Sequence, residues 1–276
     1  MSVTERPQAA AGDKRPGFPV RLSPNAGVPS ASKKSTNASD TFKPLLPKHA
    51  VPALQKPLPA GVGLDSQAVR TRMVEKLAKQ GVQDVAVLAA MGQVERHRFV
   101  DTALANQAYE DTSLPIGLGQ TISKPNVVAR MLELLREGKG VRLGRVLEIG
   151  TGCGYQAAVL SHLASEVYSI ERLRGLHEKA RENLRHFRLA NVHLLFGDGM
   201  EGFAKGAPYA AIIAAAGGEA IPPAWIEQLA VGGRLVAPMQ TASGQQALVV
   251  IDKTAQGIRQ TVLEAVHFVP LKSGTN

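Results

Sequence analysis

Three alternating glycines, Gly150, Gly152 and Gly154, form the pattern in this chain that points most directly to ligand chemistry. They follow the apolar run RVLEI and precede the Ala-rich stretch YQAAVL, which predicts a strand, a glycine turn and a helix. Glycines let the backbone bend sharply and approach a ligand, and the free N–H groups at a helix start face that ligand. Tyr155 stands where the dinucleotide fingerprint G-x-G-x-x-G would continue. The spacing therefore favours an adenosyl group with an amino-acid tail over a pyrophosphate.

Acidic residues follow the glycines at places where they could hold such a cofactor. Glu171 ends the second predicted strand about 20 residues beyond the turn, where a carboxylate can accept hydrogen bonds from both ribose hydroxyls. Asp198 and Gly199 belong to the GDG segment that closes the third strand, where the carboxylate can approach an adenine amino group. Either carboxylate could instead be an ordinary solvated group at a strand end. Glu148, inside the first strand, is expected to order the glycine turn near the helix N-terminus, with direct contact to the ligand as the alternative.

A long segment upstream, AYEDTSLPIGLGQTISKP at residues 108–125, has the composition of a loop, with two prolines and two glycines. Long structured loops usually carry function. Its last residue, Pro125, suits the first turn of a helix over NVVARMLELLRE. Ser123 is placed to cap that helix.

Cys153 is the only cysteine, so the chain can form no internal disulfide and no cysteine-based metal cluster, which fits a reducing cytoplasm. Its position inside the glycine turn suggests a small residue packed under a cofactor, with a nucleophilic role as the alternative. The seven histidines show neither H-x-x-x-H nor HExxH spacing. No metal site is predicted.

Alternating patterns predict the fold. Helices are expected over SQAVRTRMVEKLAKQ and DVAVLAAMGQVERHRFV; then the strands RVLEI, EVYSIE, VHLLFGDG, AAIIAAA and GRLVAPM alternate with helical or connecting segments. This is the pattern of an α/β fold, a doubly wound, mostly parallel sheet with helices on both faces. The last runs, ALVVID and EAVHFVPL, lack a crossover helix between them and predict antiparallel strands at one edge. Ligands bind such sheets at the carboxyl ends of the strands, where the winding reverses.

Charge and proline concentrate at the N-terminal end. Residues 1–65 hold ten prolines and +5 of the formal net charge of +9, without a helical or alternating apolar period, which predicts a disordered basic leader. It could be a tether, a dispensable extension, or a segment absent if synthesis begins near Met73. Residues 66–276 are predicted to form one domain, with N-terminal helices and a substrate loop in 66–140 and a cofactor-binding sheet in 141–276. This domain is only mildly basic, and neither a secretory signal nor a membrane-spanning run is found, so no nucleic-acid or membrane partner is expected.

The GQTISKP loop, the GTGCGYQAA turn and the segments IER, GDG, APYAAIIAAA and VHFVPL together resemble the protein-L-isoaspartate O-methyltransferase family, whose members are class I S-adenosylmethionine-dependent methyltransferases. The resemblance covers roughly Val69 to Leu271 and leaves the leader outside. It implies transfer of a methyl group from S-adenosyl-L-methionine to the free α-carboxylate of L-isoaspartyl residues in damaged proteins. The ester would then close to a succinimide that partly reopens as aspartate.

The resemblance also implies roles for individual residues. It places the family's catalytic serine at Ser123, whose hydroxyl would donate to one carboxylate oxygen while the other attacks the methyl group; a simple capping role stays open. Thr121 and Ile122 would border the cofactor. The turn would hold the methionine portion through Gly150, Thr151, Gly152, Gly154, Tyr155 and Gln156. An ionised carboxylate needs no general base, so alignment is the main task of the protein.

Three positions depart from the family pattern. Ala210 stands where the family usually has Asp, and we expect a structural loss there. Lys124 replaces a frequent glutamine and adds positive charge beside the carboxylate site, which would strengthen attraction of the substrate. Cys153 replaces a serine, which is a small change in size.

Three other classes compete with this interpretation. A methyltransferase acting on DNA or RNA amines would need an N/D-P-P-Y/F cluster where this chain has AAAGGEAIPP. A nicotinamide dehydrogenase is disfavoured by the glycine spacing and the antiparallel ending. A cofactor-binding protein without turnover remains an alternative if Ser123 is only a cap. We therefore predict a monomeric, cytoplasmic repair methyltransferase.

Overall fold

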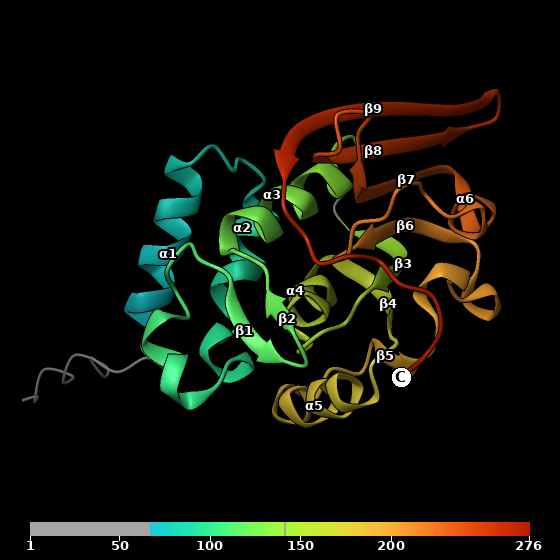
Figure 1. Ribbon diagram of the computed structural model, residues 1–276. Coiled ribbons are helices and arrows are strands. Elements are labelled where there is room, and N and C mark those ends of the chain that lie inside the picture. Colours follow the sequence, from blue (N-terminus) through green and yellow to red (C-terminus); the bar gives the residue numbers. More distant parts are fainter. Residues whose placement is uncertain (1–66, 141) are drawn as a thin grey trace, which may run out of the picture. The chain divides into compact units, whose positions relative to one another are not determined.

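The computed structural model describes residues 67–140 and 142–276, and the predicted leader lies outside this part of the chain. A seven-stranded sheet runs through the domain in the order β5-β4-β3-β6-β7-β8-β9 (Figure 1). Strands β3 to β7 pair in parallel, while β8 and β9 pair antiparallel at one edge, which confirms the predicted sheet. The strand bounds are β3 Leu143–Ile149, β4 Ala164–Glu171, β5 Val192–Phe196, β6 Tyr209–Ala214, β7 Leu229–Gln240, β8 Gln246–Thr254 and β9 Gly257–Val266.

The strand order reverses beside β3. The chain runs outward from β3 through β4 to β5, and then crosses back so that β6 pairs with the other side of β3. The carboxyl ends of β3, β4 and β6 therefore meet at one place, where the loops diverge and leave room for a ligand. The glycine turn follows β3 directly, so it lies at this place.

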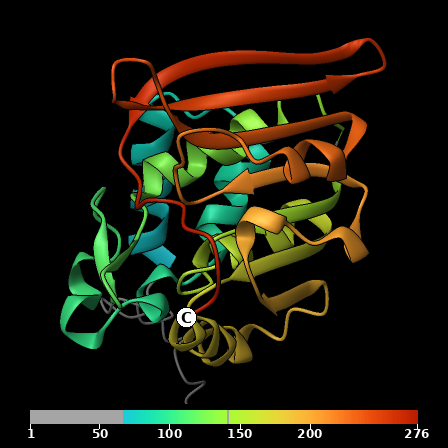
Figure 2. The same ribbon diagram turned by 45° about the vertical axis from the view of Figure 1, so that its right-hand side comes forward.

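Helices cover both faces of the sheet. Figures 1 and 2 show α1, α2 and α3 packed together beside the sheet, with β8 and β9 at its far edge. Side chains that alternate along β3 enter two separate hydrophobic clusters: Val146 joins the cluster with α1 to α5, and Leu147 joins the cluster with α6. The helix bounds are α1 Gln67–Lys79, α2 Val85–Gln93, α3 Pro125–Arg136, α4 Tyr155–Leu163, α5 Arg174–Leu184 and α6 Pro223–Gln228.

The segment expected to be a loop contains a β-hairpin. Strand β1 (Leu114–Gly117) pairs antiparallel with β2 (Gln120–Ile122), and its turn has positive φ angles at Gly117, Leu118 and Gly119 of 100°, 52° and 70°. The two glycines take these angles without the clash a Cβ would cause, which lets so short a segment reverse. The apparent loop composition was thus the composition of a tight hairpin.

Two further boundaries differ from expectation. The helix predicted over residues 84–100 ends at Gln93, and a short 3₁₀ helix, Arg96–Phe99, follows it. The run EAVHFVPL was expected to be a strand, but β9 begins earlier and ends at Val266. The chain then leaves the sheet as an extended segment, residues 267–276, which we call the strap.

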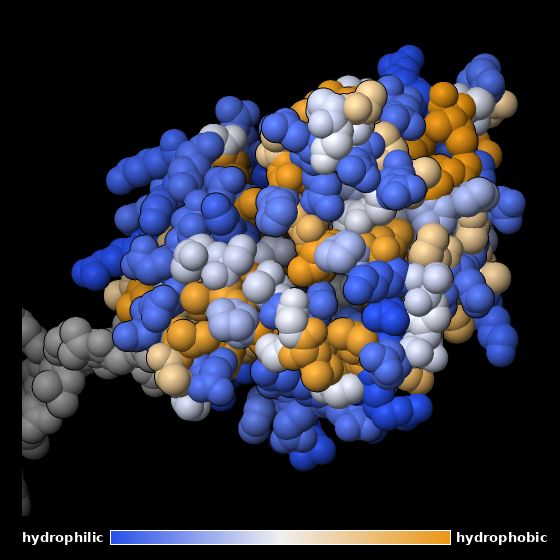
Figure 3. Space-filling view, viewed as in Figure 1, coloured by the Kyte–Doolittle hydropathy of each residue, from blue (hydrophilic) through white to orange (hydrophobic). Residues whose placement is uncertain are grey.

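The strap crosses the carboxyl ends of the strands, from β9 to the end of β5 near α5 (Figure 1). A parallel bridge joins its Pro270 to Gly217, and Leu271 donates its N–H to the carbonyl of Gly217 at 2.8 Å. On the face seen in Figure 3, hydrophobic side chains are interspersed with hydrophilic ones where the hairpin and the strap lie in Figure 1. No helix in residues 67–140 or 142–276 combines the length and the apolar character needed to cross a bilayer.

Candidate active site

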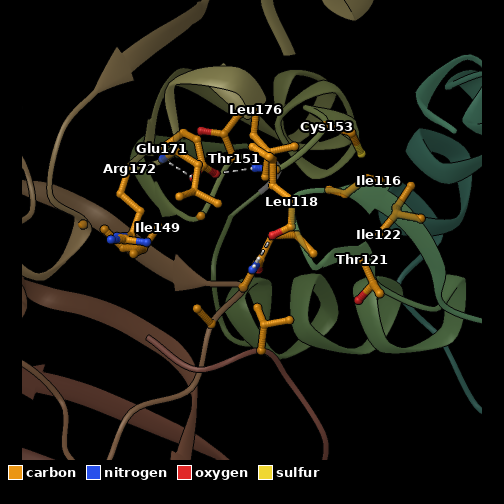
Figure 4. Close-up of a pocket in the computed structure, with 18 of the residues that line it drawn as sticks. Ile116, Leu118, Thr121, Ile122, Ile149, Thr151, Cys153, Glu171, Arg172 and Leu176 are labelled. Carbon is orange, nitrogen blue, oxygen red and sulfur yellow. Dashed lines mark hydrogen bonds between the residues drawn. The ribbon is translucent and has the colours of Figure 1, made fainter. Parts of the chain in front are cut away.

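A cavity of about 480 Å³ lies at the carboxyl ends of β3 and β4, between the hairpin and the strap. Figure 4 shows its hairpin residues, among them Ile116 and Ile122, opposite Glu171 and Arg172 at the end of β4. The volume suits a small-molecule ligand. Most of the predicted site residues line this cavity: Thr121, Ile122, Ser123, Gly150, Thr151, Gly152, Tyr155, Gln156, Glu171 and Gly199. Gly154 and Asp198 do not line it.

The glycine turn is shaped by backbone angles that other residues rarely adopt. Gly150 and Gly152 have φ angles of 88° and 57°. A Cβ on Gly152 would lie 3.2 Å from Cδ1 of Ile116, so the turn also needs its small residue to pack against the hairpin. Gly154, at φ 91°, is the N-cap of α4, and a Cβ there would lie 3.1 Å from Cδ1 of Leu184. Gly154 thus permits close packing against α5 and does not line the cavity.

Glu171 is fixed at the mouth of the turn. It is the last residue of β4 and is 5% exposed. One carboxylate oxygen, Oε2, accepts the N–H of Gly152 at 2.8 Å, and Oε1 accepts the N–H of Leu173 at 2.9 Å. A carboxylate offers about four acceptor positions, so each oxygen can still accept a hydroxyl from a ligand. The two N–H donors orient the group toward the cavity that it lines.

A buried polar cluster lies beneath the turn. Glu148 is fully buried, accepts the hydroxyl of Ser169, and has its pKa raised to about 8, chiefly by burial. The hydroxyl oxygens of Ser169 and Thr151 are 2.6 Å apart. The side-chain amide of Gln156 faces Glu148 and lowers its pKa, against the larger effect of burial. Because Gln156 and Thr151 line the cavity, this cluster offers polar groups to a ligand with an ammonium or a carboxylate.

The two predicted site residues of the GDG segment, Asp198 and Gly199, have different roles. Gly199 lines the cavity, and a Cβ there would lie 2.6 Å from Cγ2 of Ile149, so only glycine fits. Asp198 accepts the N–H of Met200 at 2.8 Å through Oδ1 and the N–H of Gly274, in the strap, at 2.5 Å through Oδ2. Its carboxylate therefore ties the strap to the end of β5.

Ser123 does not cap α3, so this part of the sequence interpretation was wrong. The N-cap residue of α3 is Lys124, whose side chain makes no capping bond. The first free N–H of the helix, at Asn126, is instead accepted by Oδ1 of Asp111 at 2.9 Å. A carboxylate at a helix N-terminus also suits the helix dipole. The Ser123 hydroxyl is half-buried and donates no hydrogen bond to any described residue.

Arg96 binds the backbone carbonyl of Ser123 from the protein interior. Arg96 was not identified from the sequence as part of the site. Its guanidinium is fully buried, donates from Nη2 to the carbonyl of Ser123 at 2.8 Å, and donates from Nε to the carbonyl of Ala108 at 2.7 Å. The Arg96 Cζ also lies 4.8 Å from the ring centroid of Tyr155. Burial lowers the pKa of Arg96, but a guanidinium stays charged. No signal in the sequence distinguishes Arg96 from the nearby Arg98 in RHRF.

A groove of about 1210 Å³ adjoins the cavity. The two share Thr121, Ser123, Ala215 and the strap residues 269–271. The groove continues over the start of α3 and the segment after β6, and its lining includes the charged residues Lys124 and Glu219. Lys124 is exposed and forms no ion pair within the described residues, so its charge is available to a ligand in the groove.

The strap was missed as part of the site, because it was expected to be a strand. Its Val269 to Lys272 and Asn276 line the cavity. Arg172 donates from Nε to the carbonyl of Gly274 at 2.8 Å, and the N–H of Asn276 donates to the carbonyl of Arg172 at 2.9 Å. One side-chain bond and one backbone bond therefore fix the strap against the end of β4.

Cys153 is buried against the cavity, and its carbonyl accepts the side-chain amide of Asn183 at 2.9 Å. Burial raises the pKa of its thiol to about 11, so a nucleophilic thiolate is not formed at neutral pH. Ala210, the other departure in size, lies in β6 outside the cavity, where Gly144 packs against it. In the described part of the chain, no three His, Cys, Asp or Glu side chains converge to hold a metal ion.

A family model described as protein-L-isoaspartate(D-aspartate) O-methyltransferase matches residues 68–276. The chain belongs to this family. Two relatives match the chain over nearly its whole length. A protein-L-isoaspartate O-methyltransferase of Methylibium petroleiphilum is 56% identical over 282 residues, with all of both chains covered. Another, from Leptothrix cholodnii, is 55% identical, with 95% of this chain and 96% of the relative covered.

Solved structures agree with the family. One protein-L-isoaspartate O-methyltransferase has a TM-score of 0.67 and 29% identity, covering 74% of this chain and 66% of that chain. A Plasmodium falciparum family member, solved with S-adenosyl-L-homocysteine, has a TM-score of 0.65 and 24% identity, covering 74% of this chain and 98% of its own. The second likeness bears on the fold alone.

Proposed function

We propose that this chain transfers a methyl group from S-adenosyl-L-methionine to the free α-carboxylate of L-isoaspartyl residues in damaged proteins. Family membership supports the reaction class. One feature of the site carries the assignment of roles: the Ser123 hydroxyl, which caps no helix, lies where the cavity and the groove meet. The cavity suits the cofactor, and the groove suits a peptide.

The residues of the cavity fit the cofactor. The Glu171 carboxylate has acceptor capacity for a ribose diol, and the Gln156 amide and the Thr151 hydroxyl, which both line the cavity, suit the amino-acid end. Gly150, Gly152 and Gly199 allow the close approach that a Cβ would prevent. When bound, S-adenosyl-L-methionine supplies a methyl group on a positively charged sulfur. Thr121 and Ile122, on β2, would border it from the hairpin side.

The chain's part in the reaction is to hold the substrate carboxylate in line. Carboxylates are ionised at neutral pH, so no base has to remove a proton. Ser123 would donate its hydroxyl hydrogen to one carboxylate oxygen and leave the other oxygen free to attack. Such alignment can supply several kcal/mol of the rate enhancement. Lys124, next to Ser123 in the groove, would add positive charge that attracts the anionic substrate.

We further propose that the methyl ester leaves the enzyme and closes to a succinimide, which partly reopens as aspartate. We expect the enzyme to act as a monomer in the cytoplasm, without a nucleic-acid partner. The mild charge of the domain supports the lack of a nucleic-acid partner, and its single cysteine supports a reducing compartment.

Labelled S-adenosyl-L-methionine and a pair of peptides that differ only in isoaspartate or aspartate test the reaction. We expect methyl label on the isoaspartyl peptide alone, as a base-labile ester. Equal labelling of both peptides, or of neither, would contradict the proposal. Sizing of the same preparation by light scattering tests the monomer.

A further inference from the structure

We propose that Arg96 is a positioning residue for Ser123, acting together with Asp111. This inference rests on the proposed function, because it concerns the aim of the Ser123 hydroxyl. Arg96 is fully buried, yet it forms no ion pair in the part of the chain that the structure describes. A buried charge without a counter-ion is costly, so its contacts must contribute something else.

Those contacts converge on the segment that carries Ser123. The forked guanidinium donates to the Ser123 carbonyl at 2.8 Å and to the Ala108 carbonyl at 2.7 Å. Nη2 also reaches the carbonyl of Thr112 at 3.5 Å, at the limit of a hydrogen bond. Arg96 thus joins two points that precede the hairpin, Ala108 and Thr112, to Ser123, which directly follows it. A lysine could not make these bonds in the same directions.

Asp111 fixes the same segment from its other end. Its Oδ1 accepts the N–H of Asn126 at 2.9 Å, and its Oδ2 accepts the side-chain amide of Gln80 at 3.2 Å. The bonds from Arg96 and Asp111 together hold the backbone that follows the Ser123 Cα, from the Ser123 carbonyl to the Asn126 N–H. Before it, Ile122 is held by its pairing with Leu114 in the hairpin. With the backbone held on both sides, the direction of the Cα–Cβ bond of Ser123 is set, and its hydroxyl is aimed by that bond.

Arg96 also links Ser123 to the cofactor side. Its guanidinium lies over the ring of Tyr155, which begins α4 directly after the glycine turn and lines the cavity. A shift in one part of the site would therefore be resisted by the other. Misplacement of a reacting group by about 1 Å can cost about 100-fold in rate, so this link bears directly on turnover.

The test compares Arg96→Lys with Arg136→Lys in the full chain. Arg136 is also buried and donates to Asp84 at 2.8 Å, but it lies at the far end of α3 from Ser123. We expect Arg96→Lys to lower kcat by about tenfold, while the Kd for S-adenosyl-L-homocysteine changes less than about threefold. Arg136→Lys should lower Tm with kcat within about twofold.

Two further measurements keep the outcome decisive. Guanidinium ion at millimolar concentration should partly restore kcat to Arg96→Ala, whereas methylammonium should not. Asp111→Ala, at a half-buried position, should lower kcat several-fold with cofactor affinity kept, and it serves if the Arg96 variants do not fold. Unchanged kcat in folded Arg96→Lys and Asp111→Ala, or equal losses of kcat and cofactor affinity, would overturn the proposal.

Hydrogen exchange separates this proposal from the proposed function. Faster exchange at residues 122–126 in Arg96→Lys, and not in Arg136→Lys, is expected whether or not the wild-type protein methylates an isoaspartyl peptide. Inactive wild-type protein would refute the function alone. Unchanged exchange across this segment would refute the positioning.

Discussion

The two sides of the active site are built in different ways. The residues proposed to bind the cofactor's ribose and amino-acid end come from one short stretch, residues 145–171, in which strand, glycine turn, helix and strand follow each other, although the hairpin, Gly199 and the strap complete the cavity wall. The substrate side is assembled from distant segments: the hairpin, the 3₁₀ helix that carries Arg96, the segment after β6, and the strap. A local unit keeps its geometry through backbone angles and neighbours in sequence. A dispersed one depends on long-range bonds such as that from Arg96 to the Ser123 carbonyl.

This difference predicts separable defects. Substitutions on the cofactor side should act through cofactor affinity, because the glycine turn and Glu171 line the cavity and not the groove. Substitutions on the substrate side should act through kcat, because Ser123 lies at the junction of the two cavities. The strap belongs to both, since Val269 to Leu271 line both cavities.

The largest effect is expected from Ser123→Ala. Loss of one hydrogen-bond donor to the reacting carboxylate should lower kcat about 100-fold. Because the Ser123 hydroxyl caps no helix, Tm and the Kd for S-adenosyl-L-homocysteine should hardly change. Steady-state kinetics with an isoaspartyl peptide, calorimetric titration and thermal melts measure all three. A collapse of cofactor affinity in this variant would erase the distinction between the two sides.

Glu171→Gln tests the cofactor side. The amide has a single acceptor oxygen, so one of the N–H groups of Gly152 and Leu173 would face its NH₂ group. We expect the Kd for S-adenosyl-L-homocysteine to rise about tenfold or more, with kcat at saturating cofactor within about threefold of wild type. Glu166→Gln, earlier on β4 and paired with His193, is the matched control and should leave both values unchanged. If Glu171→Gln altered kcat alone, the carboxylate would not be a cofactor ligand.

The same difference explains what the sequence could reveal. The parallel sheet, the antiparallel edge, the glycine turn and Glu171 were predictable, because periodicity and spacing encode local units directly. Pro125 at the start of α3 was predictable for the same reason.

Other features depended on contacts between distant residues. Ser123 is the best local cap candidate for α3, but Asp111 from 15 residues upstream takes that place. The strap has the apolar composition of a strand, but its backbone bonds go to Gly217 and Arg172 across the sheet ends. The role of Arg96 could not be predicted, because nothing in the sequence shows that its guanidinium reaches three backbone carbonyls. Tertiary hydrogen bonds of this kind leave no periodic trace.

The smallest expected effect comes from the strap, through Gly274→Pro. Gly274 has a φ of 74°, which proline cannot adopt, and proline lacks the N–H that Asp198 accepts at 2.5 Å. The strap should therefore come away from the ends of β4 and β5, and the cavity should lose part of its wall, including Asn276. Since the loss of one such bond costs about 1 kcal/mol, we expect the Kd for S-adenosyl-L-homocysteine to rise about fivefold, through faster dissociation. Thr275→Ala, which leaves the backbone bonds intact, is the control.

A stopped-flow measurement of cofactor dissociation in both variants sharpens the comparison. If only dissociation accelerates, the strap acts with the cofactor side; if the KM for the isoaspartyl peptide also rises, the strap forms part of the peptide groove through residues 269–271. No change in either value would show that the cofactor is held by the local unit alone, since Gly150, Gly152 and Glu171 would then be enough to retain it.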